Sequence, residues 1–187
     1  MRNYTLLWII CILLMSAYPL AGGSWQWATS FGGQGMESAW DMDVNTLSGD
    51  IYVCGDFTDS LVVAGSVYPA SGESDSYIIK YNSLGMFQWI WTCGSSEQDV
   101  CLSIATDAAG NCCFSGFYSG SMTIEGNQYQ SNGGWEGYMG KLSSDGELLW
   151  FRSFGGPLTD LGYGISVDLE GNCYVTGWFG GTIDFGN

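Results

Sequence analysis

The sequence predicts an all-β protein made of repeated antiparallel sheets, and two observations support this class. The first is an internal repeat: "DAAGNCCFSGFY" at 107–118 returns as "DLEGNCYVTGWF" at 168–179, an offset of 168 − 107 = 61 residues. The second is that short apolar stretches alternate with clusters of Gly, Asn, Asp and Ser, and that no stretch keeps a helical period. The chain is therefore expected to be a row of similar β units.

Identical residues recur at this offset without a gap, among them Trp89 and Trp150, Lys80 and Lys141, and Tyr77 and Tyr138. An earlier copy begins at Trp27, where "WATSFGG" matches "WFRSFGG" at 150–156. One extra residue in "NTLSG" places Asn45 opposite Asp107 and Asp168.

The repeat divides residues 24–187 into copies near 27–88, 89–149 and 150–187, which amount to about 2.6 units. Residues 1–23 stand before them and have the pattern of a cleaved secretory signal: Arg2, an apolar run from Leu6 to Met15, and a small-residue exit. That run is shorter than the roughly 20 residues of a membrane span. An uncleaved N-terminal anchor is the alternative to a cleaved signal.

Each copy contains two expected hairpins. In the second copy, "CLSIATD" and "CCFSGFY" flank the turn "AAGN", and "YMGKLS" and "ELLWFRSF" flank "SSDG". Between them, "SMTIEGNQYQSNGGWEG" is a long connection in which loop-borne function is expected. Four antiparallel strands per repeat predict a β-propeller-like array of four-stranded blades.

The pattern W-x-x-x-F-G-G, then D-x-x-G-N-x-Y-x-x-G-x-F, then G-T-I-D-F-G, resembles the secreted bacterial β-propeller repeat, SBBP. The resemblance implies a fold and leaves the activity open. The third copy stops at "TIDFGN", before a second hairpin, so the sequence predicts an incomplete propeller whose missing blades come from the rest of a longer chain.

Composition narrows the candidate partners. The full chain has 19 Asp and Glu against 4 Lys and Arg, with a formal net charge of −15. Nucleic acid is therefore not expected as a partner, since its binding depends on basic side chains, and no membrane insertion is expected after signal cleavage.

Catalytic patterns are scarce in this sequence. It contains no His, no G-x-S-x-G and no phosphate-binding G-x-x-x-x-G-K, so His-based catalysis and His metal sites are excluded. No enzyme activity, cofactor or metal is expected. Paired carboxylates that hydrolyse glycosidic bonds remain the alternative.

Several charged positions have a structural and a functional interpretation. Asp41, Asp43 and Asn45 resemble the start of a calcium loop, but Thr46 and Tyr52 break the pattern, and solvated side chains on one strand face are favoured. Asp107 and Asp168 are expected to stabilise turns. Lys80 and Lys141 are expected to pair with nearby carboxylates rather than with a repeated ligand.

Six cysteines follow the signal, and an exported chain permits disulfides. Since only Cys112 and Cys173 occupy matching repeat positions, mostly reduced and packed thiols are favoured over a full set of bridges. A bond between Cys112 and Cys113 is not expected, because adjacent strand residues point to opposite faces.

The repeated Trp27, Trp89 and Trp150 are expected to pack between blades. Trp135 and Trp178 do not recur, because Ser74 and Phe117 take their positions, and they are the candidate ligand-binding residues. Core or inter-blade packing is the alternative for both.

These features favour a non-catalytic exported segment that acts as a scaffold or binding module for protein or glycan at the bacterial cell surface. The alternatives are a carboxylate-dependent glycan-active enzyme and a purely structural fragment of a larger secreted protein.

Overall fold

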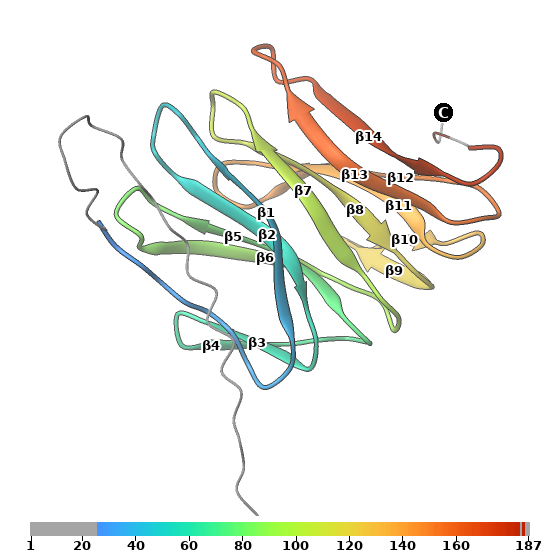
Figure 1. The fold of residues 1–187 in the computed structure, drawn as a ribbon, viewed down its shortest axis with the longest axis horizontal. Helices are drawn as coiled ribbons and strands as arrows, with labels where there is room; N and C mark the ends of the chain where they lie inside the picture. Colours follow the sequence, from blue (N-terminus) through green and yellow to red (C-terminus); the bar gives the residue numbers. More distant parts are fainter. Residues whose placement is uncertain (1–25, 184, 186–187) are drawn as a thin grey trace, which may run out of the picture.

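The computed structural model describes residues 26–183 and 185, and fourteen β-strands form within them (Figure 1). The expected signal segment, 1–23, lies outside the described residues. The first sheet has the order β1 (Glu37–Val44), β2 (Ile51–Phe57), β5 (Asp75–Tyr81) and β6 (Phe87–Cys93). The second sheet has the order β7 (Val100–Thr106), β8 (Cys112–Tyr118), β11 (Glu136–Leu142) and β12 (Leu148–Phe154). The third sheet consists of β13 (Asp160–Val167) and β14 (Cys173–Phe179).

All pairs within these sheets are antiparallel, as the sequence predicts. The sheets follow one another across the molecule in chain order, and β1, β7 and β13 are neighbours through contacts of β7 with both other strands (Figure 1). The described residues form two sheets of four strands and one of two, and they do not close into a ring. The face-to-face contact between the first and second sheets is called the first junction here, and that between the second and third sheets the second junction.

The long connection within each copy differs from the expectation of a loop. It contains a two-stranded hairpin, β3 (Ser60–Val63) with β4 (Ser66–Pro69) in the first copy and β9 (Ser121–Ile124) with β10 (Asn127–Gln130) in the second. Its two-residue turn has positive φ at both positions, 48° at Glu125 and 80° at Gly126. Such a turn favours Asn-Gly or Asp-Gly, so Glu-Gly gave little hairpin signal.

A tyrosine on the third strand of each sheet is bonded to the first strand. Tyr77 Oη donates to the carbonyl of Ser38 at 3.0 Å, and Tyr138 Oη donates to that of Val100 at 3.1 Å. Gly116 lies between the two groups at the second site, and an added Cβ there would meet the Val100 carbonyl oxygen at 2.0 Å. The repeated Gly and Tyr therefore serve one contact.

The repeated tryptophans pack between units, as expected. Trp89 of β6 donates its indole N–H to the Ser144 carbonyl of the second sheet at 3.0 Å, and its ring covers Gly146. Trp27 makes the equivalent contact with the first sheet, at Ser83. Within residues 26–183 and 185, no helix has the length and apolarity needed to cross a membrane.

Candidate binding pocket and sheet junctions

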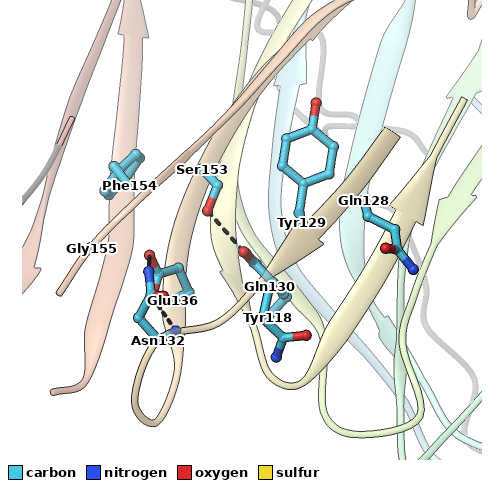
Figure 2. Close-up of a pocket in the computed structure, with 9 residues that line it drawn as sticks. All are labelled: Tyr118, Gln128, Tyr129, Gln130, Asn132, Glu136, Ser153, Phe154 and Gly155. Atoms are coloured by element: carbon cyan, nitrogen blue, oxygen red, sulfur yellow. Dashed lines mark hydrogen bonds between the residues drawn. The ribbon is translucent and has the colours of Figure 1, made fainter. Parts of the chain in front are cut away.

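A pocket of about 260 Å³ lies beside the second sheet, between hairpin β9–β10 and strands β8, β11 and β12 (Figure 2). Its lining combines aromatic rings, side-chain amides, one carboxylate and a hydroxyl: Tyr118, Tyr129, Phe154, Gln128, Gln130, Asn132, Glu136, Ser153 and Gly155. The three amide residues are exposed, whereas Tyr118 and Phe154 are buried. Polar donors and acceptors therefore surround an aromatic base.

Hydrogen bonds among the lining residues fix part of the pocket. Tyr118 Oη and Ser153 Oγ are 2.9 Å apart, and the Asn132 backbone N–H donates to Glu136 Oε2 at 3.2 Å (Figure 2). Gln130 Nε2 donates to the Gly120 carbonyl at 3.1 Å. The pocket is thus preformed by contacts within the second sheet and its hairpin.

The ionisable groups of the pocket are held neutral or shielded. Burial raises the pKa of Tyr118 to about 12, although the Ser153 hydrogen bond opposes this. Burial also raises the pKa of Glu136, the Asn132 backbone bond opposes this, and the nearby Asp160 carboxylate raises it further. Glu136 is 3% exposed, so it serves mainly to hold Asn132.

The first sheet carries a different surface at the equivalent positions. Subtracting the repeat offset of 61 residues places Val67, Pro69 and Ser71 where the second copy has Gln128, Gln130 and Asn132. Phe57 likewise replaces Tyr118. The polar lining therefore belongs to the second copy, and a comparison of the copies was the sequence signal that could have identified these residues.

The structure separates the two tryptophans proposed from the sequence. Trp135 lies just before β11, and its ring stacks on Phe117 at 4.5 Å between centroids with 39% of the residue exposed. Trp178 lies on β14 opposite Leu161 and is 62% exposed. Neither lines the pocket at the second sheet. Ligand binding by these two residues stays a prediction.

The repeated lysines form the expected ion pairs, and each also bonds to the next sheet. Lys80 Nζ is 3.0 Å from Asp50 Oδ2 and donates to the Ser144 carbonyl at 2.9 Å. Lys141 Nζ is 2.9 Å from Asp107 Oδ2 and donates to the Gly171 carbonyl at 2.9 Å. A second pocket of about 250 Å³ surrounds Lys80, whose ammonium is already paired within it.

Asp107 and Asp168 also stabilise their turns, as expected. Asp107 Oδ1 accepts from the Asn111 backbone N–H at 3.0 Å, and Asp168 Oδ1 accepts from that of Asn172 at 2.8 Å. Burial opposes ionisation of Asp107, but hydrogen bonds from Lys141 and Asn111 outweigh it and lower the pKa of this carboxyl.

The expectation of solvated side chains at Asp41 and Asp43 is wrong. Asp41 Oδ2 accepts from Ser103 Oγ at 2.8 Å and from the Ile104 N–H at 3.1 Å. Asp43 Oδ2 accepts from both the N–H and the hydroxyl of Thr106 at 2.7 Å. Both carboxylates on β1 therefore bind β7, because the neighbouring sheet brings unpaired donors to this strand face. The part of the chain that the structure describes holds no group of three or more acidic, Cys or His side chains placed to hold a metal ion.

Two pairs of buried carboxylates recur at the junctions. Asp75 and Asp99 lie at the first junction, and Glu136 and Asp160 occupy the equivalent places at the second. Both Asp160 oxygens accept backbone N–H groups, from Gly156 at 2.8 Å and Gly180 at 3.0 Å. At the first junction, Asp75 Oδ1 and Asp99 Oδ1 are buried without a hydrogen-bond partner.

One disulfide joins two sheets. Cys113 of β8 and Cys173 of β14 are bonded, with 6.3 Å between their Cα atoms. The matching positions of Cys112 and Cys173 were therefore a poor guide, because the bond crosses the second junction and uses unlike positions of the repeat. Cys54, Cys93, Cys101 and Cys112 are buried free thiols, consistent with the expectation of mostly reduced cysteines.

Residues 149–178 match the family profile described as a beta-propeller repeat, SBBP. This segment is a beta-propeller repeat of that family. It spans the last strand of the second sheet and most of the two strands of the third, so the profile follows the repeat across a junction. No curated protein sequence matches the chain.

Proposed function

We propose that this beta-propeller repeat chain is an exported, non-catalytic binding module that takes a neutral glycan in the pocket of the second sheet. The observation that carries the proposal is the exposed row of amides, Gln128, Gln130 and Asn132, above buried aromatic rings. Amides and hydroxyls bond sugar hydroxyl groups in both directions, and aromatic rings pack on the apolar face of a sugar.

Charge favours a neutral ligand over an acidic one. The chain has a formal net charge of −15, so its field repels anionic saccharides. The disulfide between Cys113 and Cys173 supports an exported location, since such bonds persist in oxidising compartments.

Glycan hydrolysis is the second candidate, because a carboxylate reaches the pocket. Hydrolysis by the usual mechanisms needs two carboxyl groups on either side of the scissile bond. Glu136 is the one carboxylate among the lining residues, and its oxygens are engaged by Asn132. Binding without turnover is therefore the better supported function.

The test uses a panel of neutral hexose and N-acetylhexosamine oligosaccharides, followed by calorimetric titration of those that bind. Gln128→Val with Asn132→Ser gives the pocket the residues of the first sheet, and we expect affinity to fall at least tenfold, or about 1.4 kcal/mol. Val67→Gln in the first hairpin is the matched control and leaves affinity unchanged.

Equal binding by the double variant and the parent chain would exclude this pocket as the site. Silence across the panel would remove the glycan proposal. Release of reducing sugar from any oligosaccharide would replace binding by hydrolysis, and Glu136→Gln would then have to abolish it.

A further inference from the structure

Two free cysteines lie on facing surfaces of the first junction. Cys54 belongs to β2 and Cys101 to β7, both are 0% exposed, and both belong to the apolar cluster shared by the first two sheets. Strand β2 packs directly against β7. No disulfide joins them in this structure, and Cys101 Sγ lies 3.7 Å from the Ser115 carbonyl as a weak donor.

Strand alternation shows that Cys54 points toward the second sheet. Tyr52, two residues earlier on β2, donates its hydroxyl to the Gly110 carbonyl of the second sheet at 2.6 Å. Residues two apart on a strand share a face. Cys54 therefore faces the first junction, on the same side as Tyr52.

The repeat supplies an independent measure of the separation. Adding the offset of 61 converts Cys54 into Ser115 and Cys101 into Gly162, which face each other across the second junction. A Cβ built on Gly162 lies 3.1 Å from the Cβ of Ser115. Cysteines whose Cβ atoms are about 3.5–4.5 Å apart are placed to form a disulfide, so a shift of a few tenths of an ångström at this position gives the required geometry.

We propose that Cys54 and Cys101 form a disulfide across the first junction in the exported protein, so that each junction carries one covalent link. The second junction already has such a link, from Cys113 to Cys173. The new bond would close a segment of 101 − 54 = 47 residues.

The other buried thiols are poorer partners. In the β7–β8 ladder Cys101 pairs with Gly116, so Cys112 lies four residues along β8, at about 13 Å. Cys54 pairs with Ile78, which pairs with Trp91, so Cys93 lies two strands away and two residues along, at roughly 12 Å from Cys54.

The bond forms by thiol–disulfide exchange with a small or protein disulfide such as oxidised glutathione. The thiolate of one cysteine attacks that disulfide and releases one thiol, and the second cysteine then attacks the mixed disulfide and releases the other. The two cysteines are oxidised, the reagent leaves as two thiols, and these carry the two protons. Burial raises the pKa of the Cys54 thiol well above its usual value, and the contact with Cys101 raises it further. The exchange is therefore expected during folding, before the core closes.

The test is peptide mapping of the full chain. The protein is refolded in a glutathione redox buffer, denatured, alkylated without reduction, digested and analysed by mass spectrometry. We expect one linked peptide pair containing Cys54 and Cys101 and a second containing Cys113 and Cys173, while Cys93 and Cys112 are alkylated. The Cys113–Cys173 pair is the internal control for oxidising conditions.

Alkylation of both Cys54 and Cys101 overturns the proposal, whether or not the control pair has formed. A link from either of them to Cys93 or Cys112 overturns it as well. As a second readout, Cys54→Ser, Cys101→Ser and the double variant should lower the thermal midpoint of the oxidised protein equally. The gap between each variant and the parent chain should shrink in reductant, whereas non-covalent packing alone would keep it.

Discussion

The two junctions between sheets use different chemistry at equivalent places. At the first junction, the carboxylates of Asp41 and Asp43 bind donors on β7. At the second, Ser103 Oγ accepts the Ile165 N–H at 3.3 Å, and a disulfide supplies the strongest link. The same stacking of sheets is therefore maintained by ionic hydrogen bonds in one case and by a covalent bond in the other.

The turn beside each lysine shows the same substitution of means. In the first copy the turn has Asn45 and Asp50, and in the second it has Asp107 and Asn111 at the matching positions. The carboxylate and the amide have exchanged places across the turn, yet each lysine pairs with the one carboxylate present. The repeat thus conserves one charge pair rather than one residue.

The largest expected effect comes from the second junction's disulfide. Replacing Cys113 and Cys173 together with Ala should lower the free energy of unfolding by roughly 4 kcal/mol, because the unfolded chain regains the freedom of a segment of 60 residues. Urea unfolding of the variant and the parent chain measures this loss. Replacing the free thiols Cys93 and Cys112 is the matched comparison, and an equal loss there would show that packing, not the bond, matters.

A second effect separates the junctions by pH. Burial raises the pKa of Asp99 to about 7, against the N–H groups of Ser95 and Ser119, and Asp75 raises it further. The folded protein then holds a proton that the unfolded chain, with an ordinary Asp pKa of 3.8, releases. Stability should therefore fall by about 3 kcal/mol as pH rises from 4 to 7 and level off above that.

Thermal melts of the parent chain and of Asp99→Asn between pH 4.5 and pH 8 check this expectation, because the variant should flatten the curve. Asp160→Asn, at the second junction, instead removes an acceptor of two backbone N–H groups and should cost stability. An unchanged slope in Asp99→Asn would assign the pH dependence to another group.

The smallest effect tests the exchanged turn residues. Asp107→Asn should cost about 2 kcal/mol, since the buried Lys141 ammonium keeps only the Gly171 carbonyl. Adding Asn111→Asp rebuilds the arrangement of the first copy, and urea unfolding should show most of the loss recovered. Failure of the second change to rescue the first would mean that the position of the carboxylate, and not only its charge, is required.

The periodic residues of this chain were enough to predict its sheets. The offset of 61 residues, the turn glycines and the repeated Trp89 and Lys80 predicted two hairpins per copy and contacts between copies. Local patterns of this kind report strand alternation and turn geometry directly. The hairpin at Glu125–Gly126 escaped because its turn lacks the usual residues.

The tertiary structure decided which side chains meet across the junctions. Nothing local in the sequence distinguishes Asp41, which binds the next sheet, from a solvated strand carboxylate, or selects Cys113 over Cys112 as the partner of Cys173. The pocket of Tyr118, Gln128 and Glu136 likewise joins three segments. Sequence alone determined the repeating unit, because its signals are periodic along the chain, whereas the site depends on contacts between units, which have no signature at short range.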